Sequence, residues 1–133
     1  MIKRSEMQKI VSEYANPRIG VLGSHSALEI MDGAKDEDLE TIVFCQKGRE
    51  TPYQRFNRIA DQVKIVNKFK DMASPTNQKL LRDTNTLIVP HRSLTAYLGY
   101  EILENKLKVP IFGNRRLFQA EERENIKNIN ITY

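Results

Sequence analysis

The sequence has a single cysteine, no tryptophan and no long apolar run. Cys45 has no second cysteine with which to form an internal disulfide, so nothing indicates secretion. The longest apolar runs, such as Leu87-Ile88-Val89, are far too short to cross a membrane. Polar residues follow Met1 to Arg4, where a signal peptide would have its apolar core. These absences predict a cytoplasmic protein without a membrane partner.

Several kinds of catalytic and binding site are missing as well. The chain has no Cys/His cluster for zinc, no Gly-x-Ser-x-Gly nucleophile elbow, and no carboxylate cluster that would hold magnesium at a triphosphate. It lacks the stripe of basic and aromatic residues that tracks nucleic acid. Lysine and arginine (21) outnumber aspartate and glutamate (17), and the net charge of +4 favours anionic partners. We therefore expect no metal site, no nucleic-acid partner and no catalytic residue.

The order of apolar and amphipathic segments predicts an α/β fold. The 133 residues, 40% hydrophobic and 29% charged, suit one globular domain. Short apolar strands are expected at 18–22, 40–45, 62–66, 86–89 and 109–112. Helices are expected at 5–14 (with a capping box of Ser5 and Gln8), from the turn at 23–26 to Gly33, and at 75–83, 94–104 and 113–127. This alternation predicts a Rossmann-like, doubly wound parallel sheet of about five strands in the order 3-2-1-4-5.

Ligands of an open parallel sheet bind outside the carboxyl ends of its strands. Four predicted strands end in loops that contain both histidines of the chain and several basic residues. These loops are Gly23-Ser24-His25-Ser26, Gln46-Lys47-Gly48-Arg49, Pro90-His91-Arg92-Ser93 and Gly113-Asn114-Arg115-Arg116. No acidic residue occurs in them before Glu50. One edge of the sheet is therefore predicted to be cationic and rich in hydroxyl groups, which suits a phosphate.

Each loop has two interpretations. At Gly23 to Ser26, a glycine can let the backbone approach a phosphate at a helix N-terminus, or a serine can simply cap the helix. At His91 to Ser93, Ser93 can bind ligand or cap the next helix. Arg115 and Arg116 can be solvated, but arginines at a helix N-terminus oppose the helix dipole, which favours an anionic partner for at least one of them. Cys45, inside an apolar strand, is expected to be buried and inert.

Four spaced motifs also resemble a known family. They are Gly23-Ser24-His25-Ser26-Ala27-Leu28; Lys47-Gly48-Arg49, followed by Pro52-Tyr53 and Arg55-Phe56; Val89-Pro90-His91 with Ser93; and Val109-Pro110, followed by Phe112-Gly113-Asn114-Arg115-Arg116. In this order they are similar to the amino-terminal domain of the archaeal formate-dependent formaminoimidazole carboxamide ribonucleotide synthetases, the PurP family of the ATP-grasp superfamily. The resemblance covers nearly the whole chain.

This resemblance implies a pre-ATP-grasp substrate-binding domain at residues 1–127, with residues 128–133 beginning a linker to an ATP-grasp domain. It implies a ligase of purine (IMP) biosynthesis that joins formate to the amine of aminoimidazole carboxamide ribonucleotide through formyl phosphate. ATP and Mg²⁺ serve the full-length family enzyme in its later domains. We therefore expect neither to bind this chain, and we expect the chain alone to be inactive.

The resemblance also implies site residues. In the family, the histidine of the first loop and the serine of the Pro-His-x-Ser loop contact the ribonucleotide, which carries over to His25 and Ser93. The predicted substrate site comprises Gly23, Ser24, His25, Ser26, Arg49, Ser93 and Arg115, with the arginines neutralising charge. The family commonly has a glycine where this chain has Arg92, so this cation either adds a phosphate contact or narrows the pocket.

Other functions stay open at this point. The chain can be a piece of such a synthetase or a stand-alone, non-catalytic module that binds a nucleotide monophosphate. A basic nucleic-acid-binding domain is a third alternative. The residues alone determine neither the roles of Arg116 and His91 nor assembly into a homo-oligomer.

Overall fold

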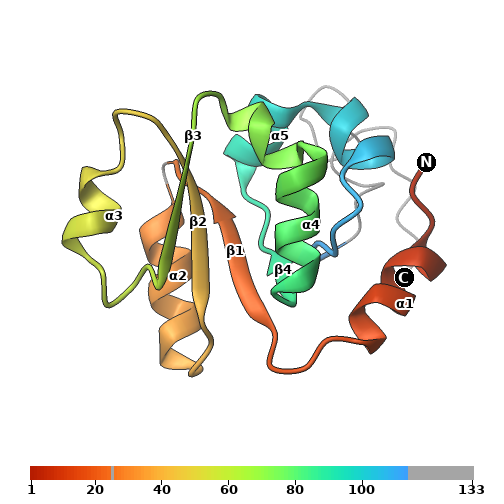
Figure 1. Cartoon of the computed structure of the whole chain (residues 1–133), viewed down its shortest axis with the longest axis horizontal. Coiled ribbons are helices and arrows are strands. Elements are labelled where there is room, and N and C mark those ends of the chain that lie inside the picture. Colours follow the sequence, from red (N-terminus) through yellow and green to blue (C-terminus); the bar gives the residue numbers. More distant parts are fainter. Residues whose placement is uncertain (25, 114–133) are drawn as a thin grey trace, which may run out of the picture.

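The computed structural model describes residues 1–24 and 26–113. Strands and helices alternate along this part of the chain (Figure 1). The strands are β1 (Arg18–Leu22), β2 (Thr41–Gln46), β3 (Gln62–Val66) and β4 (Thr86–Ile88). The α-helices are α1 (Arg4–Ser12), α2 (Ala27–Asp36), α3 (Thr51–Arg55), α4 (Pro75–Asp83) and α5 (Arg92–Leu98). A 3₁₀ helix, η1 (Phe69–Ala73), and a π-helix, η2 (Ile102–Lys106), complete the set.

The four strands form one parallel sheet in the order β3-β2-β1-β4. The predicted α/β, doubly wound architecture and the order of its first four strands are confirmed. The predicted fifth strand at 109–112 is reduced to one isolated parallel bridge between Ile88 and Ile111. It does lie at the expected position beyond β4, but β4 itself is only three residues long and offers little edge on which a fifth strand could pair.

Two hydrophobic cores lie on opposite faces of the sheet because alternate strand residues point to opposite sides. Leu22, Ile42 and Phe44 belong to the core that includes residues of η1, α4 and α5. Val21, Val43 and their neighbours belong to the core that includes residues of α2 and α3. This arrangement explains why β1 and β2 are buried almost throughout.

Several helix boundaries differ from the prediction. The helix expected at 94–104 ends at Leu98, because Gly99 follows with a φ of 84°, a left-handed conformation that stops a right-handed helix. At the first helix, Lys3 occupies the N-cap and makes no side-chain cap bond, so the predicted capping box of Ser5 and Gln8 is wrong. Gly33 lies inside α2 and does not end it.

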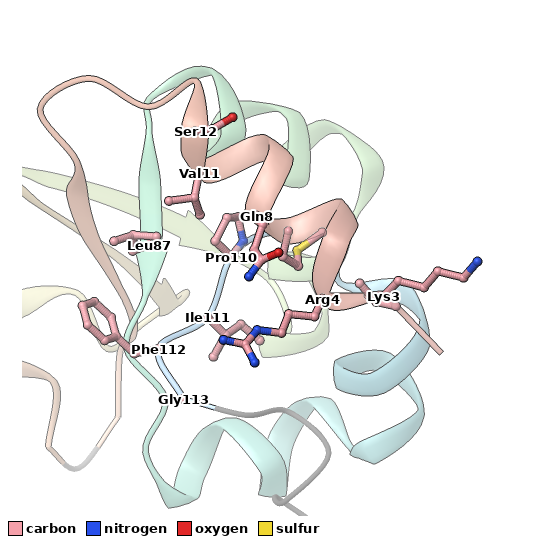
Figure 2. Close-up of a pocket in the computed structure, with 12 residues that line it drawn as sticks. Lys3, Arg4, Gln8, Val11, Ser12, Leu87, Pro110, Ile111, Phe112 and Gly113 are labelled. Carbon is pink, nitrogen blue, oxygen red and sulfur yellow. The ribbon is translucent and has the colours of Figure 1, made fainter.

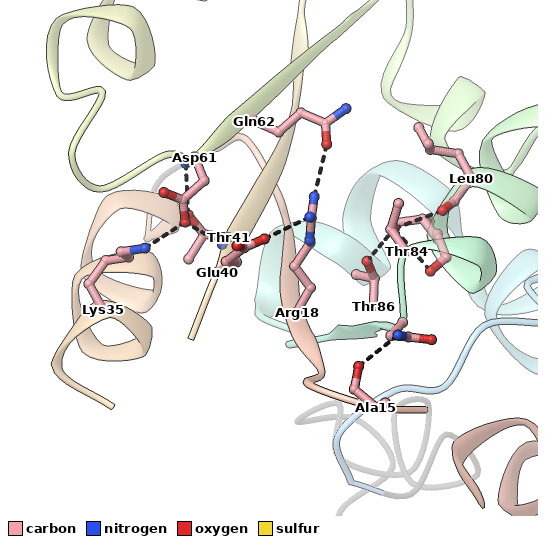
Figure 3. A network of polar contacts seen from close by, with 12 residues as sticks. Ala15, Arg18, Lys35, Glu40, Thr41, Asp61, Gln62, Leu80, Thr84 and Thr86 are labelled. Atoms are coloured by element: carbon pink, nitrogen blue, oxygen red, sulfur yellow. Dashed lines mark hydrogen bonds and ion pairs between the residues drawn. The ribbon is translucent and has the colours of Figure 1, made fainter. Parts of the chain in front are cut away.

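Polar contacts join the strands at their amino ends (Figure 3). The Asp61 carboxylate accepts hydrogen bonds from Lys35 Nζ at 2.6 Å and from the Thr41 amide at 2.8 Å. Arg18 donates to Gln62 Oε1 at 3.1 Å and pairs with Glu40 at 2.7 Å. These contacts tie β1, β2 and β3 together at the edge opposite to the predicted ligand loops.

Among residues 1–24 and 26–113, no helix combines the length and the apolar character that a membrane span requires.

Candidate functional site

The strand order creates one topological switch point, between β1 and β4. From β1 the chain passes through α2 to β2 on one side, whereas β4 lies on the other side of β1 and leads into α5. The helices α2 and α5, which follow β1 and β4, contribute to opposite cores. Ligands of doubly wound sheets bind at such a point, outside the carboxyl ends of the strands. Two of the four predicted loops, 23–26 and 90–93, follow β1 and β4, the strands on either side of this point; of the second loop, Arg92 and Ser93 already belong to α5.

Gly23 has a structural explanation that the sequence did not suggest. Its amide donates to the Phe44 carbonyl at 2.7 Å, which continues the β1–β2 pairing. A β-carbon at Gly23 would lie 2.9 Å from that carbonyl oxygen and 2.9 Å from the β-carbon of Cys45. The absent side chain is therefore required by the contact between neighbouring strands, and approach of the backbone to a ligand is not needed to explain this glycine.

The two serines of the first loop do not behave as helix caps. Ser26 is the N-cap residue of α2, but its side chain makes no cap hydrogen bond. The hydroxyl oxygen of Ser24 is buried and has no hydrogen-bond partner among the described residues. Buried polar groups in proteins nearly always have a partner, so this hydroxyl is an exception that the fold alone does not explain. The capping interpretation of this loop is thus not supported.

His91 is engaged in the fold through both of its ring nitrogens. Its Nδ1 accepts a hydrogen bond from the Ser93 amide at 3.2 Å, which makes it the N-cap of α5. Its Nε2 lies 3.0 Å from the carbonyl oxygen of Leu22, the last residue of β1. The sequence-based alternative in which Ser93 caps this helix is therefore wrong. No local signal in the sequence indicates the contact with Leu22, because the two residues are 69 positions apart.

Ser93 and Arg92 lie at the start of α5. Ser93 is partly buried, and its backbone amide rather than its hydroxyl is used in the cap. Arg92 is exposed and takes part in neither of the two ion pairs found in the described part of the chain. The structure thus places Ser93 at the start of α5, next to the His91 side chain that reaches the end of β1, and leaves Arg92 on the surface.

The loop after β2 is more exposed. Gly48 has a φ of 94°, and its amide donates to the Glu50 carboxylate at 2.7 Å. Arg49 is exposed. Because Glu50 folds back onto the loop, this part of the edge carries a negative group beside Lys47 and Arg49 and is less cationic than the sequence suggested. Cys45 is fully buried, and burial, with a smaller effect of Glu50, raises the pKa of its thiol. A protonated, buried thiol is unreactive, as expected.

Three residues of the predicted cationic edge fall outside the described part of the chain, namely the site residues His25 and Arg115 and the unassigned Arg116. In the described ranges there is no group of three or more His, Cys, Asp or Glu side chains that could hold a metal ion. The described portion of the predicted site is therefore distinguished by the unpartnered hydroxyl of Ser24 and holds no such group of side chains.

A separate groove of about 880 Å³ lies between α1 and the segment 110–113 (Figure 2). Its lining is partly apolar, with Phe112 53% exposed and Val11 41% exposed. The sequence did not predict it, because α1 and residues 110–113 are far apart along the chain. We do not place the ligand site here, since none of the residues that line this groove belongs to the loops 23–26 or 90–93.

Residues 19–132 match the profile of a family described as a protein of unknown function (DUF1246). The chain is 43% identical, over 96% of its length and 36% of the relative's, to a 5-formaminoimidazole-4-carboxamide-1-(beta)-D-ribofuranosyl 5'-monophosphate synthetase of Methanopyrus kandleri. A synthetase of the same name from Methanothermobacter thermautotrophicus is 44% identical over 95% of this chain and 35% of its own length. The chain thus spans about a third of the length of these curated relatives.

A solved structure shares the fold. The crystal structure of an IMP biosynthesis protein PurP from Thermococcus kodakaraensis superposes with a TM-score of 0.64 at 30% sequence identity. The similarity covers 77% of this chain and 31% of that chain.

Proposed function

Because the chain belongs to the DUF1246 family, as the match over residues 19–132 shows, and resembles named synthetases along nearly its whole length, we propose that it binds the ribonucleotide substrate of such an enzyme. The substrate is aminoimidazole carboxamide ribonucleotide, and the complete enzyme formylates its amine with formate at the expense of ATP. In this proposal residues 1–127 form the substrate-binding domain, and residues 128–133 begin the connection to an ATP-grasp domain.

The single observation that supports this assignment best is the orphaned hydroxyl of Ser24 at the switch point of the sheet. A phosphate oxygen accepts hydrogen bonds, and a serine hydroxyl can donate one. The first turn of α2, which follows directly, has a partial positive charge, and the helix is ten residues long. A phosphorylated ligand seated here would satisfy a donor that the described part of the protein leaves without a partner.

The remaining predicted residues have complementary roles in this proposal. Ser26 and Ser93 add hydroxyl donors from the two loops, and His25 contacts the ribonucleotide. Arg49 and Arg115 reduce the negative charge of the phosphate. None of these residues acts as an acid, base or nucleophile. The domain contributes to catalysis by holding the ribonucleotide in position for the reaction with the activated formate.

ATP and Mg²⁺ belong to the complete enzyme in this proposal. In this proposal both are held by the ATP-grasp domain and not by residues 1–127. The purified chain should therefore hydrolyse no ATP and form no formylated product. Turnover by this chain alone, with contaminating enzyme excluded, would contradict the domain assignment. The gene sequence beyond Tyr133 discriminates a synthetase from a stand-alone binding module.

Isothermal titration tests the phosphate site directly. Aminoimidazole carboxamide ribonucleotide should bind, and its dephosphorylated nucleoside should bind far more weakly. The same ligands should raise the melting temperature in that order, because stabilisation follows the ratio of ligand concentration to dissociation constant. Ser93→Ala should weaken nucleotide binding by about 1.5–3 kcal/mol, roughly ten- to a hundredfold, if its hydroxyl bonds a charged group.

A matched control is Ser5→Ala, on the exposed surface of α1, which should leave binding unchanged. Equal affinity for nucleotide and nucleoside would show that the switch point is not a phosphate site. Binding of a DNA or RNA oligonucleotide that weakens steeply with salt would favour the nucleic-acid alternative instead.

A further inference from the structure

The hydrogen bonds of His91 fix the protonation state of its ring. The Ser93 amide can only donate, so Nδ1, which receives it at 3.2 Å, carries no proton. The Leu22 carbonyl can only accept, so Nε2, at 3.0 Å from it, carries the proton. The Nε2–H tautomer satisfies both contacts, with one nitrogen used as a donor and the other as an acceptor. Neither nitrogen is left for a ligand.

These two bonds connect the serines of both ligand loops. The Leu22 carbonyl accepts from His91 and also from the Ser24 amide, at 2.9 Å. Ser24 is the residue with the buried hydroxyl that has no partner among the described residues. The other ring nitrogen holds the amide of Ser93. The imidazole is thus linked to Ser93 directly and to Ser24 through one shared carbonyl oxygen, although these serines are 69 residues apart in the sequence.

We propose that His91 is a positioning residue that sets the spacing of the Ser24 and Ser93 hydroxyls for one phosphorylated ligand, without touching that ligand. This inference rests on the proposed function. The bond to Ser93 is local and caps α5, whereas the bond to Leu22 crosses from the end of β4 to the end of β1. The crossing bond is the one that joins the two halves of the site, so ligand affinity depends on it.

Two substitutions separate the crossing bond from the local one. Asparagine at position 91 keeps an acceptor near the place of Nδ1 and is a favourable N-cap residue, but its side chain is too short to reach Leu22. Glutamine is one methylene longer and can place an amide N–H near the position of Nε2, at the expense of the cap. His91→Asn therefore retains the cap alone, and His91→Gln retains the crossing bond alone.

Isothermal titration with aminoimidazole carboxamide ribonucleotide should give a dissociation constant about tenfold higher for His91→Asn than for the wild type, the effect expected when one hydrogen bond that shapes a site is lost. Its melting temperature should stay close to that of the wild type. His91→Gln should recover most of the affinity. Wild-type affinity in His91→Asn would reduce His91 to a helix cap and overturn the proposal, as would a His91→Gln variant that binds no better than His91→Asn.

A measurement on the unsubstituted protein does not depend on the variants folding. The chain has two histidines, so ¹⁵N resonances of the imidazoles can be assigned by comparison with His25→Ala. His91 should show an unprotonated Nδ1 and a protonated Nε2, both without and with the ribonucleotide. A protonated Nδ1, or a change of tautomer on ligand addition, would overturn the proposal. Failure of the wild type to bind the nucleotide would instead refute the proposed function and leave the tautomer result unaffected.

Discussion

Gly23 lies so close to Cys45 that a β-carbon on the glycine would stand 2.9 Å from the β-carbon of the cysteine. The second close neighbour is backbone, the Phe44 carbonyl oxygen, also at 2.9 Å. Backbone in the middle of a paired strand cannot move aside easily. The first motif of the chain thus begins with a residue required by strand packing and continues with Ser24, whose hydroxyl has no partner in the described part of the chain.

Gly23→Ala should destabilise the protein, because overpacking at a rigid position costs about 1–3 kcal/mol. Gly33→Ala is a matched control, since it lies in the interior of α2 and an added β-carbon would meet no neighbouring atom within 4 Å. That change should stabilise by roughly 0.5–1 kcal/mol through helix propensity. Urea denaturation of both variants gives the comparison. A Gly23→Ala protein as stable as the wild type would show that β1 and β2 are less tightly packed than these distances imply.

The parts of the fold with simple local causes were predicted from the sequence. The strands at Arg18–Leu22 and Gln62–Val66 and the helix at Pro75–Asp83 have the expected bounds. For that helix, proline at the first position is the local signal, and the structure adds Ser74 at the N-cap, whose hydroxyl accepts from the Asn77 amide. The strand order followed from the alternation of strands and helices and from right-handed crossovers.

The features that were missed depend on distant contacts. The role of His91 requires the carbonyl of Leu22 on another strand, and no local pattern shows that the two meet. The break at Gly99 depends on a left-handed φ that glycine permits but does not impose. For the site, the loops 23–26 and 90–93 could be predicted from the topology. That Ser24 and Ser26 make no side-chain cap bond, and that His91 rather than Ser93 caps α5, could not, because this depends on side-chain positions a few ångströms apart.

Asp61 should make stability depend on pH in the acidic range. Burial alone would raise the pKa of this carboxyl, but the hydrogen bonds from Lys35 and Thr41 and the charge of Lys35 outweigh burial and lower it. A lowered folded-state pKa contributes stability that is present above the unfolded value of about 3.9 and is lost as the pH falls through the folded value.

Asp61→Asn should therefore be less stable than the wild type at neutral pH, and the difference should shrink below about pH 4. Glu40→Gln is the control. The side chain of Glu40, which forms an ion pair with Arg18, is 63% exposed, and exposed ion pairs contribute roughly 0–1 kcal/mol to stability. Urea midpoints measured between strongly acidic and neutral pH test this. A constant difference between Asp61→Asn and the wild type across the whole range would contradict the assignment.

Tyr14 should affect stability at the alkaline end. Its hydroxyl donates to the Thr86 carbonyl at 3.0 Å, and burial, only partly opposed by Arg82, raises its pKa to about 12. In the unfolded chain the phenol of Tyr14 ionises near pH 10. Its contribution to folding stability is therefore complete below that pH and declines as the pH rises toward about 12. Tyr14→Phe should lose about 0.5–1.5 kcal/mol at neutral pH and should lack this part of the alkaline decline.

Absorbance at alkaline pH gives a direct check, because one late-ionising phenol should disappear from the titration of Tyr14→Phe, while Tyr53, whose pKa burial also raises, should still ionise late. Tyr97→Phe, on an exposed ring, should leave stability within about 0.5 kcal/mol of the wild type. If the number of late-ionising phenols were unchanged without Tyr14, burial of Tyr14 would not be the source of a late ionisation.

The first loop should show a conflict between stability and binding. In the free protein the buried Ser24 hydroxyl has no partner among the described residues, and an unsatisfied buried group costs about 1–3 kcal/mol. Ser24→Ala removes that cost and should leave the free protein equally stable or more stable. The contrasting change is Ser74→Ala, which removes a hydroxyl that does accept a cap bond and should cost about 0.5–2 kcal/mol.

Ligand binding should respond in the opposite direction. If Ser24 donates to a charged phosphate, Ser24→Ala should weaken binding of the ribonucleotide by about 1.5–3 kcal/mol, while Ser74→Ala should leave the affinity unchanged. Urea denaturation and isothermal titration on the two variants give all four quantities. A Ser24→Ala protein that is destabilised by more than about 1 kcal/mol and binds normally would assign this serine to the fold. If Ser24→Ala instead keeps or gains stability and binds the ribonucleotide more weakly, the Ser24 hydroxyl serves the ligand. Its hydrogen bonding is then completed only when the ligand is present, which explains why a hydroxyl that costs stability occupies the switch point.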